Sequence, residues 1–229
     1  MTSTGVEEKP PREGAEEKPT KKFVRQITEQ CLRDRGRRAA LRRGLRRPPE
    51  EAYTMHAVVA PLLPPRLRRD HEYAYYAVAA MIAASVRDQP NTDPGDGETP
   101  GVDGVEKVAA ADGNAEPGDR PNLGQSLAWA VCRPGPGRRP MNPATAEKRL
   151  HLLVRQGYPG VYQHLAGLVQ RLGAIEVQVD WEQLLDDLCQ WRYRRDQVAK
   201  RWLQAYYRTV HEADSHAKQQ PNSEEEEAE

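Results

Sequence analysis

Residues 162–191, YQHLAGLVQRLGAIEVQVDWEQLLDDLCQW, decide the fold class. The first part repeats apolar residues at helical spacing and ends at Gly173. Asp180, with Gln183 three residues later, resembles a capping box that opens a second helix ending near Trp191. Only residues 175–179 alternate like a strand, and one short strand without a partner is better interpreted as an extended connection. The stretch therefore predicts two helices and an extended link.

The same periodicity continues on both sides of this stretch. A last helix is predicted on Val198, Trp202, Leu203 and Tyr206. Toward the N-terminus, Asn142 before Pro143 is typical of a helix start and opens TAEKRLHLLVR. Asn122 can cap a further helix that carries Leu123, Leu127 and Val131.

The first half of the chain also follows helical spacing. Phe23, Ile27, Cys31 and Leu32 share one face, and Gly36 is expected to close that helix in a left-handed conformation. A short helix with AALRRGLRR follows, and then one with Met55, Val58, Val59 and Leu62 that Pro64 and Pro65 stop. A longer helix carries the stripe Tyr73, Tyr76, Ala77, Ala80, Met81 and Ala84. We expect an all-α bundle of about eight or nine helices.

Three segments lack any apolar period. Residues 88–121 are rich in Gly, Pro and Asp and are predicted to be a flexible acidic loop inserted between two helical halves, 23–87 and 122–208. Residues 1–22 are predicted to be a disordered tail, and residues 209–229 an acidic disordered tail. The chain is thus expected to hold one helical domain, 23–208.

The formal net charge of zero conceals a strongly basic body. Residues 88–119 carry nine acids against Lys107 alone, and the chain from Glu212 onward carries seven acids against Lys218. Residues 1–22 hold five charges of each sign, so the remainder contains 27 Lys and Arg against 13 Asp and Glu. A cationic surface rich in Arg attracts phosphate polymers, which makes nucleic acid the first partner to consider.

The cysteines and the hydropathy of the chain indicate its cellular compartment. The three cysteines, Cys31, Cys132 and Cys189, are odd in number and nowhere spaced as CxxC, so neither a disulfide framework nor a zinc site is supported. No apolar run approaches the roughly 20 residues of a membrane span, and residues 1–20 lack a signal-peptide core. We expect a cytoplasmic protein without membrane association.

The sequence offers only weak candidates for catalytic residues. The histidines of HEADSH, His211 and His216, are five residues apart rather than the four that place two ligands on one helix face. Asp186 and Asp187 fall between apolar positions and are interpreted as a solvated face. No phosphate-binding GxxxxGK or GxGxxG motif occurs. The sequence therefore predicts no catalytic residue, no metal and no cofactor.

Basic clusters are the strongest functional signal. Because they lie on several elements, they do not fit a helix-turn-helix reader and favour contacts to the phosphate backbone. Aromatic residues mostly fall on the apolar stripes, although Tyr75 or Tyr193 could stack on bases. The clusters are Arg42, Arg43, Arg46 and Arg47; Arg66, Arg68 and Arg69; Arg138, Arg139, Lys148 and Arg149; and Arg192, Arg194, Arg195, Lys200 and Arg201.

The order of several motifs resembles one family. AALRRG (39–44), NLGQSLAWAV (122–131), AEKRLHLLVR (146–155), the opening stretch and WLQAYY (202–207) are together similar to the small subunit of the type I-E CRISPR Cascade complex, the CasB family. The resemblance covers roughly residues 23–208. It implies a non-enzymatic helical protein, present as two copies, that touches guide RNA and target DNA and helps to hold the displaced strand of the R-loop.

The resemblance also implies specific binding residues. The basic positions of the family fall on Arg42 and Arg43, on Lys148 and Arg149, and on Arg155, with a looser match at Arg194 and Arg195. Some relatives have Arg where Gln125 stands here, which would remove a phosphate contact. Two alternatives stay open. One is a structural scaffold whose basic faces bind acidic protein surfaces, and the other is a nucleic-acid-processing enzyme, which would need a metal or an acid/base cluster.

Overall fold

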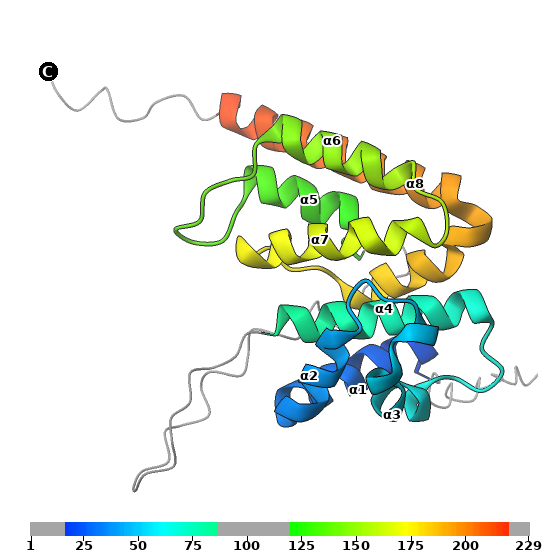
Figure 1. The fold of residues 1–229 in the computed structure, drawn as a ribbon. Helices are drawn as coiled ribbons and strands as arrows, with labels where there is room; N and C mark the ends of the chain where they lie inside the picture. Colours follow the sequence, from blue (N-terminus) through cyan, green and yellow to red (C-terminus); the bar gives the residue numbers. More distant parts are fainter. Residues whose placement is uncertain (1–16, 87–119, 220–229) are drawn as a thin grey trace, which may run out of the picture.

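The computed structural model describes residues 17–86 and 120–219, and these ranges form eight α-helices without a strand (Figure 1). The expected all-α class is confirmed. Two short 3-10 helices, η1 and η2, flank α3. The helices are α1 Pro19–Arg33, α2 Arg35–Arg43, α3 Tyr53–Val59, α4 Arg69–Ser85, α5 Leu123–Cys132, α6 Pro143–Val154, α7 Gly160–Ala174 and α8 Trp181–Gln219, with η1 Pro49–Glu51 and η2 Ala60–Leu62.

Helix α4 lies at the centre of the bundle, between α1, α2 and α3 on one side and α7 and α8 on the other (Figure 1). Every residue from Val78 to Ala83 is buried, so α4 has no solvated face along this run. A helix that is apolar all round must be covered on all sides. Tyr75 is 2 % exposed and packs edge-on against Phe23, so the expectation that it could stack on bases was wrong.

The second half is built around α8, against which α5 packs closely. A Cβ added to Gly124 would lie 1.9 Å from the backbone oxygen of Trp202, so only glycine permits this approach. Trp191 and Trp202, both fully buried, have ring centroids 4.9 Å apart. Their burial joins α8 to the core shared by all the helices.

Three predicted helix starts are confirmed by capping geometry. The side chains of Asn122 and Asn142 accept from the backbone N–H of Gln125 (3.2 Å) and Thr145 (3.1 Å). Asp180 accepts in the same way from Gln183 (2.9 Å). The Gln183 side chain does not return to the cap and instead donates to Asp187. The connection after α7 forms no strand, as the sequence predicted for residues 175–179, but residues 175 and 176 form a turn, with a left-handed backbone at Glu176 (φ 61°), before residues 177–180 lead into α8.

Both boundaries of the first helix differ from those expected from the sequence. Asp34, not Gly36, separates α1 from α2, because its side chain accepts from the N–H of Arg37 (3.0 Å) and caps α2. Gly36 therefore lies inside α2. Helix α1 begins at Pro19, within the segment expected to be a tail.

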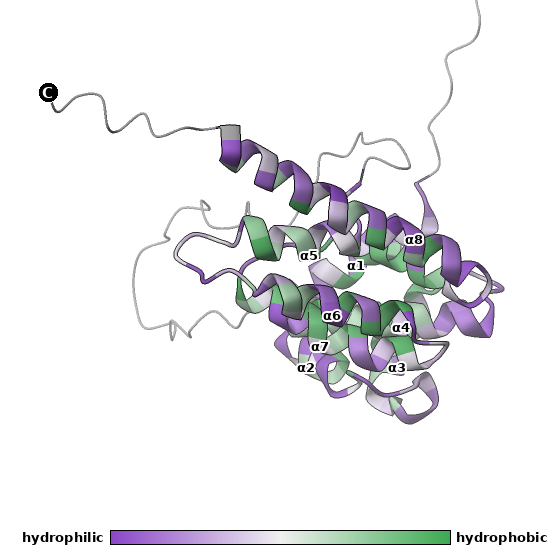
Figure 2. Ribbon diagram, turned by 90° about the horizontal axis from the view of Figure 1, so that it is seen from above, coloured by the Kyte–Doolittle hydropathy of each residue, from purple (hydrophilic) through white to green (hydrophobic). Residues whose placement is uncertain are grey.

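Helix α8 contains both of the last two predicted helices. They meet at Arg194, whose backbone (φ −131°, ψ 29°) is not helical. The helix then continues to Gln219, so residues 209–219 are not the disordered tail that their acidic composition suggested. Figure 2 shows this end of α8 as mostly hydrophilic and extending beyond its neighbours.

Most of the expected acidic insertion, 88–119, lies outside the described residues, as do residues 1–16 and 220–229. At the edge of that segment, Arg120 is described and forms an ion pair with Glu182. Within the described ranges, no helix is long and apolar enough to cross a membrane.

Candidate nucleic-acid interface

The first basic cluster follows the end of α2. Leu41 is buried, whereas Arg42 and Arg43 are exposed on the last turn. Gly44 follows the last turn as the C-cap, and a Cβ there would lie 1.9 Å from the sulfur of Met55, so glycine permits the close approach of α3. The chain then turns through Arg46, which has a left-handed backbone (φ 66°).

Arg46 links the two halves of the molecule. Its Nη2 lies 3.0 Å from the position that a Cβ of Gly167 would occupy, so its guanidinium contacts α7. Arg47, the next residue, is exposed. The cluster therefore presents side chains beside both α2 and α7.

Arg138 and Arg139, from the third of the predicted clusters, lie on the connection between α5 and α6. Arg138 donates to Glu176 (2.6 Å), and the N–H of Gly135 donates to the carbonyl of Ile175 (3.0 Å). These contacts fasten the connection to the segment after α7. Arg139 is exposed beside them. Because a carboxylate already compensates Arg138, Arg139 is the better placed of the two for a phosphate.

The basic residues on and directly after α6 differ in their exposure to solvent. Leu150 and Leu153 pack inward, and Lys148 and Arg155 are exposed. Seven residues make almost two full turns, so these two cations lie on one face. Arg149 is half-buried, and its Nε is buried without a hydrogen-bond partner among the described residues. Arg149 is therefore less available to a ligand than its neighbours.

The last cluster surrounds the break in α8. Arg194 and Arg195 are exposed, and Arg195 pairs with the adjacent Asp196 (3.1 Å). Tyr193 is 55 % exposed, and the guanidinium carbon of Arg68 lies 4.5 Å from its ring centroid. Arg68 also donates to the Tyr193 hydroxyl. Sequence periodicity could not reveal this contact, because 125 residues separate the partners.

Many of the predicted cations have no carboxylate close to them. Within residues 17–86 and 120–219, none of the following side chains has an acidic oxygen within 4.0 Å: Arg43, Arg46, Arg47, Arg139, Lys148, Arg149, Arg155 and Arg194.

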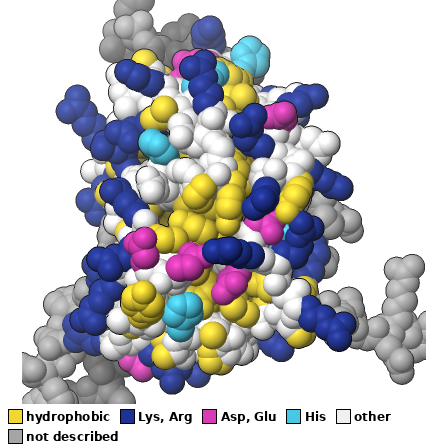
Figure 3. All heavy atoms as spheres, turned by 45° about the vertical axis from the view of Figure 1, so that its right-hand side comes forward, with side chains coloured by type: hydrophobic (Ala, Val, Ile, Leu, Met, Phe, Trp, Pro, Cys, Tyr) yellow, Lys and Arg dark blue, Asp and Glu magenta, His cyan; other side chains and the backbone are white. Residues whose placement is uncertain are grey.

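The clusters do not converge on one point. Figure 1 shows α2 and α6 on opposite sides of α4, with the break in α8 at one end of the bundle. On the face seen in Figure 3, Lys and Arg side chains are spread over both margins and also over the middle, where apolar and acidic side chains lie between them. Such an arrangement suits an extended polyanion better than a single small ligand.

The interpretation of Asp187 as part of a solvated face was wrong. The residue is fully buried, and its Oδ2 accepts from Trp202 Nε1 (2.6 Å). Its Oδ1 accepts from Gln183 (3.0 Å) and from Arg201 (2.5 Å). Burial raises the pKa of this carboxyl group above its ordinary value. Asp187 therefore holds together the two parts of α8 on either side of Arg194. Asp186 is half-buried, and burial also raises its pKa.

Comparison with known proteins identifies the family. The family model for the CRISPR-associated protein Cse2 matches residues 37–207. Among curated proteins, no match was found.

Solved structures agree with the family match. A chain of a CRISPR RNA-guided surveillance complex is 34% identical and has a TM-score of 0.68, with 87% of this chain and 97% of that chain covered. A chain of a pre-nicking surveillance complex is 36% identical, with the same coverage and a TM-score of 0.66. A Cse2-family protein from Thermus thermophilus shares the fold at 24% identity, with 82% and 97% covered and a TM-score of 0.56. The chain belongs to the Cse2 family of CRISPR-associated proteins, the CasB small subunits.

Proposed function

We propose that this protein is the non-enzymatic small subunit of a type I-E CRISPR surveillance complex and that it stabilises the opened DNA strands of the R-loop. Its partners are the guide RNA, the target and displaced DNA strands, the other subunits of the complex and a second copy of itself, in the cytoplasm. The family match and the likeness to chains of CRISPR RNA-guided surveillance complexes support this proposal.

The observation that carries the proposal is the set of exposed, uncompensated cations on separate helices. Lys148 on α6, Arg155 directly after that helix and Arg43 at the end of α2 are exposed and have no carboxylate within 4.0 Å among the described residues. Cations without internal partners attract phosphates and release condensed counterions when they bind them. The absence of internal neutralisation therefore favours a polyanionic partner.

The arrangement also favours backbone contact over sequence reading. The exposed cations are spread over the end of α2, a connection, α6 and the break in α8, so among the described helices they are not concentrated on one that could enter a groove. In RNA-guided complexes, base pairing with the guide supplies the sequence specificity. A subunit that holds the strands needs only a cationic surface of suitable length.

Single-stranded DNA binding at several salt concentrations tests the phosphate contacts. Changing Lys148 and Arg155 together to Ala should weaken binding to unrelated sequences alike and should flatten the slope of log K against log salt by about 0.7 for each lost contact. The matched control replaces Arg25 and Arg37, which already pair with Glu17 (3.0 Å) and Asp34 (3.3 Å). That control removes the same charge and should leave the slope unchanged. Loss of binding to one sequence only would contradict the proposal.

A scaffold role is the second candidate, and exposed apolar side chains favour it. Tyr53 is 78% exposed and Leu152 is 48% exposed, and such side chains are suited to protein contacts. Under this alternative, the same Lys148 and Arg155 substitutions would release the subunit from the complex while leaving strand binding unaffected.

A further inference from the structure

Two of the four predicted basic clusters meet at the break in α8. Figure 1 shows the start of α4 and this break at the same end of the bundle. Arg68, directly before α4, donates to the hydroxyl of Tyr193, and its guanidinium carbon lies 4.5 Å from the centroid of that ring. The contact brings the cluster of Arg66, Arg68 and Arg69 beside the cluster that begins at Arg192.

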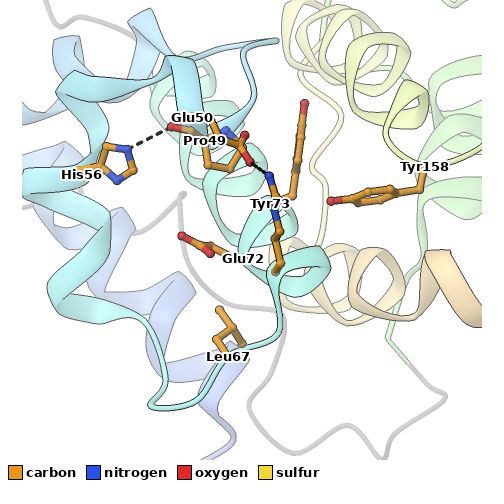
Figure 4. A pocket seen from close by; sticks show the side chains of 8 residues that line it. Pro49, Glu50, His56, Leu67, Glu72, Tyr73 and Tyr158 are labelled. Carbon is orange, nitrogen blue, oxygen red and sulfur yellow. Dashed lines mark hydrogen bonds and ion pairs between the residues drawn. The ribbon is translucent and has the colours of Figure 1, made fainter.

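Tyr193 is the outer end of a row of aromatic rings. Tyr73 stacks on Tyr162 with centroids 4.4 Å apart, and Tyr158 packs edge-on against Tyr73 at 5.7 Å. Figure 4 shows Tyr158 directed toward Tyr73 at the edge of a cavity of about 370 Å³. The Arg192 guanidinium carbon lies 5.4 Å from the centroid of the Tyr158 ring and 5.9 Å from that of Tyr193. Arg192 thus links the inner rings to Tyr193 at the surface.

Tyr193 and its cationic neighbour keep much of their surface open. The tyrosine is 55% exposed, and the Arg68 side chain is 60% exposed although it lies over the ring. Tyr162 is buried and Tyr158 is half-buried, so these inner rings pack as core residues. An aromatic side chain left as open as Tyr193 gains little from burial. Its ring and the guanidinium on it are therefore available to a ligand.

The charge around Tyr193 is positive. Asp70 contacts Arg68 Nε at 3.7 Å but is buried, and Asp196 pairs with Arg195 (3.1 Å). Three further arginines of the two clusters are exposed and have no carboxylate oxygen within 4.0 Å among the described residues: Arg66, Arg192 and Arg194.

A nucleotide of a single strand matches both the ring and the cations. Its base has a flat π-face that stacks on tyrosine or on a guanidinium, and its phosphates pair with arginine. An acidic protein segment matches only the cations, because the negative face of an aromatic ring repels a carboxylate. In a duplex, the bases are enclosed in the stack and do not reach a side chain of this kind. The site therefore favours an unpaired nucleotide.

We propose that the break in α8 binds one unpaired nucleotide, with its base stacked against Tyr193 and the Arg68 guanidinium and its phosphates held by the surrounding arginines. Stacking here rests on the proposed function, because the protein must first hold a nucleic-acid strand. It adds a contact to a base, which restricts this end of the bundle to single strands. Every base has a π-face, so the contact is independent of sequence.

Two oligonucleotides of equal length and charge test the site on the full chain. One is an oligothymidine strand, and the other is an abasic strand that has the same phosphates without bases. Competition between them at fixed salt gives the ratio of the two affinities. We expect the unmodified protein to bind the thymidine strand about tenfold more tightly, which lies in the range that one stacked base contributes.

Tyr193→Ala should abolish this preference and leave the affinity for the abasic strand nearly unchanged. Tyr193→Phe should retain the preference, because the ring and not the hydroxyl stacks on the base. The matched control is Tyr53→Ala, which removes a tyrosine that is 78% exposed and has no cation over its ring within the described residues. That control should keep the full preference.

Three results would overturn the stacking contact alone. Equal affinity of the unmodified protein for the two strands would show that no base is recognised, although phosphate binding would stand. Parallel loss of both affinities in Tyr193→Ala would show that the ring only positions the arginines. An unchanged preference in that variant would exclude stacking on Tyr193, and its release from the complex would then assign the ring to a protein contact. Failure of the unmodified protein to bind either strand would overturn the contact together with the proposed function.

Discussion

Asp187 is the residue whose role differs most from its sequence context. It sits between apolar positions of an amphipathic helix, where an acid usually faces solvent. Its partner Trp202 lies 15 residues later, beyond the break at Arg194, so helical periodicity could not bring the two together. Only the change in direction of α8 buries the carboxylate.

Removing this carboxylate should destabilise the protein. Asp187→Ala leaves the buried Trp202 Nε1–H without an acceptor, and we expect a loss of about 2–3 kcal/mol in the free energy of unfolding. Urea denaturation of the variant and of the unmodified protein measures this loss. The control Asp196→Ala, with a side chain that is 90% exposed, should change stability by less than about 0.5 kcal/mol. Equal effects in the two variants would contradict the structural role of Asp187.

The cysteines give a prediction that depends on pH. Burial raises the pKa of Cys31 to about 11 and that of Cys189 to about 12. In the native protein at pH 8, alkylation should therefore modify half-buried Cys132 first, and fully buried Cys31 at least about tenfold more slowly than in urea.

The same raised pKa values make stability depend on pH. Above pH 9 the thiols of the unfolded chain ionise before those of the folded protein, so the free energy of unfolding should fall as pH rises toward 11. Mass spectrometry of labelled peptides and denaturation series check both expectations. Rapid native labelling of Cys31 would contradict its burial.

Helix starts were more predictable than helix ends. Asn122, Asn142 and Asp180 each cap the helix that the sequence placed after them, because this interaction spans only three residues. Asp34 was missed because two helices meet there with no intervening loop. The sequence does not predict the extension of α8 to Gln219, because an acidic composition is typical of disordered segments.

The contact between α5 and α8 depends on one glycine. A side chain at Gly124 would collide with the backbone of Trp202, which cannot move without displacing α8. Gly124→Ala should therefore cost about 3 kcal/mol of stability despite the higher helix propensity of alanine. Gly157→Ala is the matched control, since nothing lies within 4 Å of an added Cβ there. Thermal melting of both variants measures the difference. Similar melting temperatures would show that the two helices can separate without cost.

At the scale of the whole molecule, charge segregation in the sequence predicted a cationic body and the chemistry of its partner. The sequence could not predict which cations remain uncompensated, since that depends on contacts between distant residues. Arg138 is paired through Glu176, and Arg149 is half-buried, although both belong to clusters that look equivalent in the sequence. The cavity between η1, the start of α4 and Tyr158 was also not predictable, because these segments meet only in the fold.

Strand holding by α6 is the central claim, and the lifetime of target-bound R-loops on relaxed plasmid tests it most directly. In complexes with verified subunit stoichiometry, changing Lys148 and Arg155 together to Ala should shorten the lifetime by about tenfold, since two exposed charge contacts of about 0.7 kcal/mol each amount to that factor. The R-loop is nearly balanced against the duplex, so small contacts decide its persistence. The Arg25 and Arg37 control should match the unmodified complex. An unchanged lifetime in the fully assembled Lys148 and Arg155 variant would contradict strand holding.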